Sequence, residues 1–262
     1  MSDSLPLRLV LASASPARRK SLQAAGIQPD VLVSGVDESV VVTDRAEDLC
    51  LELARLKAQA VLARLSPATS ANEDTATGNT ASNGSTANTG NGTTAGTRNE
   101  TGKTASTGTG QRTLIIGCDS VLAFDGEILG KPADPADATQ RWLRMRGRSG
   151  VLHSGHCLID SVTGRRAEAV ASTTVHFADI SDDEIAAYVA TGEPLAVAGA
   201  FTIDGLGGPF VERIEGDPGT VVGLSMPLLR RLLAELGLQI TDLWTTVAPG
   251  GQSVEPLGNV RS

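Results

Sequence analysis

The sequence predicts an α/β protein with a mixed central β-sheet flanked by helices, and three observations lead to this fold class. Short apolar runs, typical of buried strands, alternate along the chain with segments of helical periodicity. Gly and Pro residues mark the boundaries between these segments. Some neighbouring runs are joined by short turn sequences that indicate antiparallel hairpins, so the sheet is expected to be mixed rather than purely parallel.

Periodicity and boundary signals place the individual elements. We expect strands over residues 7–12, 31–36, 114–118, 121–124, 127–129, 156–159, 167–177, 201–203 and 210–214. We expect helices over residues 16–25, 44–65, 134–147, 181–192 and 225–236.

Local motifs support several of these boundaries. Ser15 suits the N-cap of the first helix and Pro16 its first position. The pairs Asp44 with Glu47 and Ser181 with Glu184 resemble capping boxes. The dipeptide at 125–126, Asp-Gly, is a strong hairpin signal.

The net charge of the chain and the length of its apolar runs exclude some classes of function. The chain has 262 residues, with 22 Lys and Arg against 30 Asp and Glu, which gives a formal net charge of -8. This balance argues against a protein that coats nucleic-acid polymers, because such binding depends on Lys and Arg neutralising phosphates. No apolar run approaches the roughly 20 residues of a membrane helix, and no secretory signal is visible at the start.

Three cysteines, Cys50, Cys118 and Cys157, lie in apolar surroundings. Their small, odd number favours buried thiols in a reducing compartment over disulfides. We therefore expect a cytoplasmic protein without a membrane partner.

A low-complexity segment interrupts the pattern of strands and helices. From Ser66 to Gly110 the chain is mostly Thr, Gly, Asn, Ser and Ala, with no large apolar residue. Such a segment offers no apolar surface to offset its ordering entropy, so we expect disorder. The remaining chain of about 215 residues is long enough for a substantial core. Composition alone leaves open whether the segment is a linker between domains or an insert within one.

A possible phosphate site follows the first strand. Ser13 and Ser15 can donate hydroxyl hydrogen bonds, Arg18 offers a planar fork of donors, and a helix N-terminus favours anions. A simple capped helix with surface arginines explains the same residues equally well. Lys131, in Gly-Lys-Pro, does not belong to a P-loop, and alone it fits a solvated lysine better.

Acidic residues follow two of the predicted strands. Asp37 and Glu38 end one strand, and Asp119 directly follows another. Two carboxylates brought together can hold Mg²⁺ with water and phosphate oxygens, although acids at strand ends also commonly face solvent. His153 and His156 lack the partners of a zinc site or a serine triad.

Taken together, the motifs resemble those of the Maf family, also called septum-formation inhibitors, of nucleoside triphosphate pyrophosphatases. They occur in family order between about residues 7 and 237. The matching segments are LASASPARRKSLQAAG, VDE, LA-x-x-KA, CDSVLAFDGEILGKP, T-x-V-x-F, YVATGEP, AGAFTIDG and GDPGTVVGL.

The resemblance implies a single Maf-like domain over residues 5–241, of the Maf and inosine-triphosphatase fold type. Residues 66–111 would then be a disordered insert within it, and residues 242–262 a mobile tail. The implied reaction is hydrolysis of a nucleoside triphosphate, either canonical or with a non-canonical or modified base, to the monophosphate and diphosphate with a divalent cation, Mg²⁺ or Mn²⁺.

The resemblance also implies roles for individual residues. Asp119 matches the catalytic proton acceptor, and Arg18, Lys57 and Lys131 match cationic site positions. Glu38 and Asp119 are the expected metal ligands. The expected substrate-binding positions are Ser13, Ser15, Ala17, Ser120 and Asp204.

Three of these positions depart from the pyrimidine branch of the family, which carries Arg, Thr and Gln where this chain has Ala17, Ser120 and Asp204. These departures argue against thymidine or uridine triphosphates as preferred substrates. Two other functions remain: a nucleotide-binding regulator of cell division with little turnover, and a house-cleaning enzyme for deaminated purine triphosphates. Whether the chain forms a homodimer is also open.

Overall fold

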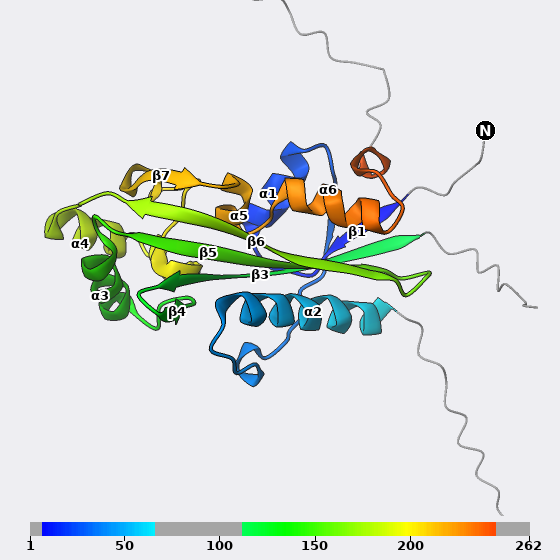
Figure 1. Cartoon of the computed structure of the whole chain (residues 1–262), viewed down its shortest axis with the longest axis horizontal. Coiled ribbons are helices and arrows are strands. Elements are labelled where there is room, and N and C mark those ends of the chain that lie inside the picture. The colour runs from blue at the N-terminus through cyan, green and yellow to red at the C-terminus, as the bar shows by residue number, and fades with distance from the viewer. Residues whose placement is uncertain (1–6, 66–111, 245–262) are drawn as a thin grey trace, which may run out of the picture. The chain divides into compact units, whose positions relative to one another are not determined.

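The computed structural model describes residues 7–65 and 112–244, which fold around one seven-stranded mixed sheet (Figure 1). The strands are β1 (Arg8–Leu11), β2 (Asp30–Val31), β3 (Thr113–Phe124), β4 (Glu127–Leu129), β5 (Ser149–Asp160), β6 (Arg166–Phe177) and β7 (Val211–Glu215). The α-helices are α1 (Pro16–Ala24), α2 (Ala46–Leu65), α3 (Pro135–Met145), α4 (Asp182–Ala190), α5 (Pro218–Val222) and α6 (Met226–Glu235). The predicted insert at 66–111 and residues 245–262 of the predicted tail lie outside the described residues.

The strand order is β2-β1-β3-β5-β6-β7, and β4 pairs with β3. β1 is parallel to β2 and β3, whereas the pairs β3–β5, β5–β6 and β6–β7 are antiparallel. In Figure 1, α2 covers one face of the sheet and α1, α5 and α6 cover the other, while α3 and α4 lie at one end. The prediction of a mixed sheet flanked by helices is therefore confirmed.

Because β1 is short, one edge of β3 lacks a strand partner from the described chain over part of its length, while the other edge pairs with β5. β1 pairs with residues 113–116 of β3, and β4 pairs with residues 122–124 on the same edge. Among the described residues, no strand pairs with residues 117–121 on that edge. We call this stretch the open edge of β3; it lies where β1 ends and its chain turns into α1.

Helix α2 lies unusually close to the sheet because glycines face it. A Cβ atom on Gly117 or Gly155 would run into the backbone carbonyl oxygens of Ala54 and Cys50, respectively. Such close approach is a recurrent reason for glycine within strands. It brings the buried side of α2, including Lys57, directly against the open edge of β3.

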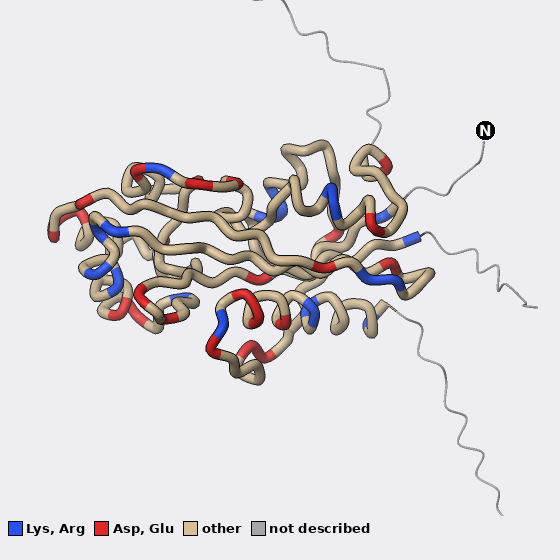
Figure 2. Tube along the Cα trace, in the orientation of Figure 1, with Lys and Arg blue, Asp and Glu red and all other residues tan. Residues whose placement is uncertain are grey.

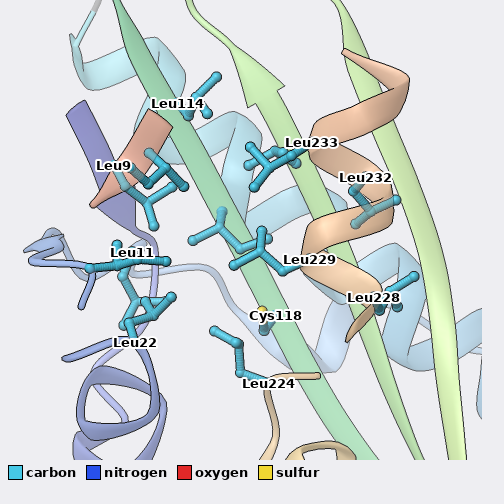
Figure 3. Close-up of a cluster of buried hydrophobic side chains, with 14 of the residues drawn as sticks. Leu9, Leu11, Leu22, Leu114, Cys118, Leu224, Leu228, Leu229, Leu232 and Leu233 are labelled. Atoms are coloured by element: carbon cyan, nitrogen blue, oxygen red, sulfur yellow. The ribbon is translucent and has the colours of Figure 1, made fainter. Parts of the chain in front are cut away.

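A leucine-rich core holds the parallel part of the sheet (Figure 3). Leu228, Leu229, Leu232 and Leu233 of α6 are buried against residues from β1, β3 and α1. Burial of each such side chain contributes about 1.5–3 kcal/mol. The three cysteines are buried free thiols, as predicted, and burial raises the pKa of Cys118 to about 11.

An aromatic cluster fills the other end of the sheet. It contains the four Phe residues, the one Tyr and Trp142. Trp142 makes edge-to-face contacts with Phe177, Tyr188 and Phe210. Its indole N–H donates to the carbonyl of Ala200 at 2.8 Å, which fastens the chain after α4 to this cluster.

Two predicted strands are wrong. Instead of residues 31–36, the strand β2 contains only Asp30 and Val31, and Glu38–Val40 forms a 3₁₀ helix. This segment lies at the sheet margin, where the apolar side chain of Val33 is half exposed, so burial does not hold it in a strand. Residues 201–203 are also irregular, and 3₁₀ turns surround them.

Other boundaries differ more mildly. α2 begins at Ala46, so Arg45 rather than Asp44 precedes it, and the predicted capping box there is wrong. Residues 114–118 and 121–124 belong to one continuous strand, because pairing with β5 passes unbroken through Asp119. The Ser15 cap, the Ser181–Glu184 capping box and the hairpin at Asp125-Gly126 are confirmed. No described helix combines the length and apolar character needed to cross a membrane.

His156 joins β5 to the start of α6. Its Nδ1–H donates to the carbonyl of Ser154 at 3.0 Å, and its Nε2 accepts from the backbone N–H of Ser225 at 2.9 Å. This arrangement requires a neutral ring. Burial lowers the pKa of His156 to about 4.

The buried His156 makes stability fall in mild acid. The unfolded chain binds a proton with a pKa near 6.5, while the folded chain resists protonation until about pH 4. Folding free energy of about 3 kcal/mol is therefore lost as pH falls through this window. Urea unfolding between pH 7 and 4 should show a shallower pH slope for His156→Gln than for wild type. Equal slopes for His156→Gln and wild type would contradict the assignment.

Candidate active site

A cavity of about 740 Å³ opens at the open edge of β3. The turn from β1 into α1, the loop before α2, and the segment 196–204 form its walls together with α2, β3 and β4. All ten residues predicted for the site line this cavity: Ser13, Ser15, Ala17, Arg18, Glu38, Lys57, Asp119, Ser120, Lys131 and Asp204.

Lys57 binds two carboxylates at once. Its Nζ lies 2.5 Å from Asp119 Oδ1 and 2.6 Å from Glu38 Oε1. Lys57 and Asp119 are buried, whereas the Glu38 side chain is half exposed. Because α2, β3 and the preceding loop each supply one of these groups, three separate elements meet at a single ammonium group.

The surroundings of Asp119 and Glu38 shift the pKa values of these two carboxylates in opposite directions. Burial raises the pKa of Asp119 above its ordinary value, although the Lys57 charge opposes the shift. Burial also raises the pKa of Glu38, but the hydrogen bond and charge of Lys57 outweigh it and the net pKa is lowered. The two pKa values therefore shift in opposite directions, and the upward shift of Asp119 is the direction that favours a proton acceptor.

Arg18 connects α1, β3 and the end of α5. Its Nε donates to the Gly223 carbonyl at 2.9 Å. Its Nη1 donates to the Cys118 carbonyl and to Ser13 Oγ, both at 3.0 Å, and its Nη2 donates to Ser120 Oγ at 3.1 Å. These bonds use four of the five guanidinium N–H groups. Arg18 thereby provides a hydrogen-bond donor for the Cys118 carbonyl at the open edge of β3, and one of its own N–H groups remains for a ligand of the cavity.

The hydroxyl group of Ser120, the residue after Asp119, also makes its hydrogen bonds within the protein. Ser154 Oγ donates to the Thr220 carbonyl at 2.8 Å, so its single proton is used there. Ser120 Oγ, 2.7 Å from Ser154 Oγ, must then be the donor of that pair. Because Ser120 accepts from Arg18 and donates to Ser154, it offers the cavity only an acceptor.

The Ser13 hydroxyl, in contrast, acts only as an acceptor within the protein. Its Oγ accepts from the backbone N–H of Ser15 at 3.2 Å and from Arg18. Its hydroxyl hydrogen therefore remains for a further acceptor. Ser15 caps α1 by accepting from the backbone N–H of Arg18, so the first turn of this helix faces the cavity with its positive dipole end.

Comparison with known proteins decides the family. A family model described as "Maf-like protein" matches residues 8–236. The chain belongs to the Maf family. A Salinispora tropica protein named nucleoside triphosphate pyrophosphatase is 71% identical over 245 residues, which cover 94% of this chain and 91% of that protein.

Two further relatives of this Maf chain carry the same name. The Streptomyces coelicolor protein is 49% identical and the alignment covers 90% of this chain and 94% of that protein. The Microcystis aeruginosa protein is 42% identical, with 92% of this chain and 100% of that protein covered.

The lining of the cavity in this Maf protein contains equal numbers of acidic and basic side chains. Arg18, Lys57 and Lys131 face Glu38, Asp119 and Asp204 among its lining residues. Figure 2 shows Lys and Arg positions interspersed with Asp and Glu positions along the described chain. A polyanionic ligand therefore needs either an added cation or a rearrangement around Lys57.

Several contributors were missed from sequence. Ser154, Thr220 and Gly223 act through hydrogen bonds to Ser120 or Arg18, and only tertiary contacts reveal them. Asp37, a member of the predicted acidic set, does not line the cavity, because its carboxylate caps the turn at Ser39. The described residues contain no cluster of three or more His, Cys, Asp or Glu arranged to bind a metal.

Arg18→Lys should destabilise the fold as well as impair the site. A lysine cannot reproduce four divergent donors, so buried acceptors lose partners and the free energy of unfolding should fall by about 1–3 kcal/mol. Arg19→Lys, at the next and exposed position of α1, is the matched control and should change stability by less than about 0.5 kcal/mol. Urea unfolding measures both; equal stability of the two variants would show that Arg18 has no structural role.

Proposed function

We propose that this chain hydrolyses a nucleoside triphosphate to the monophosphate and diphosphate. The observation that carries the proposal is the buried Lys57–Asp119 pair, with Glu38, beside the N-terminal turn of α1. The name shared by the relatives, nucleoside triphosphate pyrophosphatase, supports the same reaction.

The residues suggest a division of tasks. Asp119 accepts a proton from the attacking water as the water oxygen bonds to phosphorus, and the bridging P–O bond between the α- and β-phosphates breaks. Lys57 and Lys131 stabilise charge on the phosphoryl oxygens and on the leaving diphosphate. Ser13 donates its free hydroxyl hydrogen to a phosphate oxygen. Arg18 mainly holds these groups in place, because most of its donors are engaged within the protein.

The residues fit a divalent cation, Mg²⁺ or Mn²⁺, held by Glu38 and Asp119. Both carboxylates contact the Lys57 ammonium, so they lie close together at the cavity. Two carboxylates with water and substrate phosphates form a usual Mg²⁺ environment. When bound, such an ion supplies charge neutralisation for the polyphosphate.

The base preference follows from the lining residues. The lining residues of the segment 196–204 carry no cation, and Asp204 is the one charged group among them. The Asp204 carboxylate can accept two N–H groups side by side, which a purine with a ring N–H next to an exocyclic amino group presents, whereas thymine and uracil each present one ring N–H. We therefore propose a purine or modified base in preference to thymine or uracil.

The proposed activity is tested by diphosphate release from a panel of standard, deaminated and methylated nucleoside triphosphates with Mg²⁺ or Mn²⁺. Wild type should release diphosphate and monophosphate in equal amounts. Asp119→Asn should reduce the rate about 10²- to 10⁴-fold, since it removes the proton acceptor.

Asp183→Asn is the matched control and should keep the wild-type rate, because Asp183 is exposed on α4 and does not line the cavity. Absence of turnover by wild type, or an unchanged rate in Asp119→Asn, would overturn the proposal. Tight nucleotide binding without product would instead favour the regulatory alternative.

A further inference from the structure

The segment that follows α4 forms a cavity wall but has no regular secondary structure to hold it. Thr202 and Asp204 of this segment line the cavity, and Asp204 is exposed there. An irregular segment at such a place needs other contacts to fix its side chains. Its contacts converge on one carboxylate that does not itself line the cavity, that of Glu193.

The Glu193 carboxylate accepts four hydrogen bonds. Tyr188 Oη donates to Oε1 at 3.0 Å and Thr202 Oγ1 donates to Oε1 at 2.6 Å. The backbone N–H of Leu206 donates to Oε2, and that of Gly207 donates to Oε1, both at 3.0 Å. These bonds bracket Asp204 on both sides, at residues 202 and 206.

The backbone is shaped to allow this approach. A Cβ atom on Gly205 would lie 2.5 Å from Glu193 Oε2, and one on Gly207 would collide with the Tyr188 hydroxyl. Tyr188 itself accepts from the backbone N–H of Thr202 at 3.2 Å. The two glycines therefore let the turn close around Glu193 and Tyr188, which fixes the backbone that carries Asp204.

The start of the segment is fastened separately. Ala200 is fully buried with a φ of 62°, a conformation that costs a non-glycine residue energy. The hydrogen bond from Trp142 to its carbonyl, and one from Gly199 N–H to the Gly130 carbonyl at 3.1 Å, hold it there. The anchor at Ala200 and the anchor at Glu193 thus secure this wall from both ends.

The chemistry of the cavity indicates what this wall contacts. The lysines and Arg18 come from α1, α2 and the loop after β4, so a polyphosphate belongs beside those elements. The Gly199 end of this wall bonds to the loop that carries Lys131, whereas Thr202 and Asp204 at the other end carry no positive charge, so we assign that end to the uncharged base. This step rests on the function proposed above.

We propose that Glu193 is a positioning residue for base selection: it holds the turn at 202–207 so that Thr202 and Asp204 present fixed hydrogen-bonding groups to the nucleobase. It touches neither the phosphates nor the reacting atoms. Its loss therefore weakens recognition of the base and leaves the phosphate end unaffected.

The test measures the two products separately as ligands of the full-length protein. Calorimetric titration gives the Kd of the nucleoside monophosphate, which contains the base, and of inorganic diphosphate, which does not. In Glu193→Gln, the Kd for the preferred monophosphate should rise about tenfold, because an amide N–H₂ opposes backbone donors and one or more hydrogen bonds are lost. The Kd for diphosphate should change by less than about twofold.

Turnover gives a second readout. The ratio of kcat/KM between the best and the poorest base should shrink about tenfold in Glu193→Gln, mainly through KM. Tyr188→Phe removes one donor to Glu193 and the acceptor for Thr202, and should shift the same quantities in the same direction. Glu184→Gln, which alters the capping box of α4 away from the cavity, is the matched control and should leave both ligands and the base ratio unchanged.

Equal weakening of monophosphate and diphosphate in Glu193→Gln, or an unchanged base ratio in both variants, would overturn this proposal and assign Glu193 a purely structural role. Wild-type protein that binds and hydrolyses no nucleotide would overturn the proposed function instead. If Glu193→Gln fails to fold, the base ratio of Tyr188→Phe decides.

Discussion

The site depends on one buried ammonium group. Lys57 reaches the open edge of β3 and binds both Asp119 and Glu38, so a residue of α2, a residue of the sheet and a loop are held together by charge. A buried charge is tolerated only when it is paired, and removal of one partner is costly. This requirement holds Lys57 of α2 against β3, and the Lys57 charge opposes the rise in the pKa of Asp119 that burial causes.

Other features of the fold serve this arrangement. Gly117 and Gly155 let α2 approach the sheet, and the leucines of α6 pack the parallel strands from the opposite face. Arg18 donates to the Cys118 carbonyl and to the Ser120 hydroxyl oxygen at the open edge, where the short β1 provides no strand partner. Ser154 accepts the Ser120 hydroxyl hydrogen and thereby fixes the direction of this group. Because β1 ends early, the cavity opens at this edge of the sheet.

Signals within a few residues of one another predicted most of the fold. The Ser15–Pro16 cap, the Asp125-Gly126 turn and the Ser181–Glu184 box each act locally, and each is found as expected. Residues 31–36 failed as a strand, because strand formation there depends on burial that the sheet margin does not supply. The ten residues predicted for the site came from local motifs and the family resemblance, and all ten line the cavity. Ser154 and Glu193 act through contacts with residues distant in the chain and leave no local pattern.

The coupling between Lys57 and Asp119 is the central claim, and a double-mutant cycle measures it directly. Rates of diphosphate release are compared for wild type, Lys57→Met, Asp119→Asn and the double variant. If the two side chains act as one unit, the double variant should lose about as much kcat/KM as the worse single variant. If the losses of the two single variants simply multiply, Lys57 and Asp119 act independently and the account is wrong.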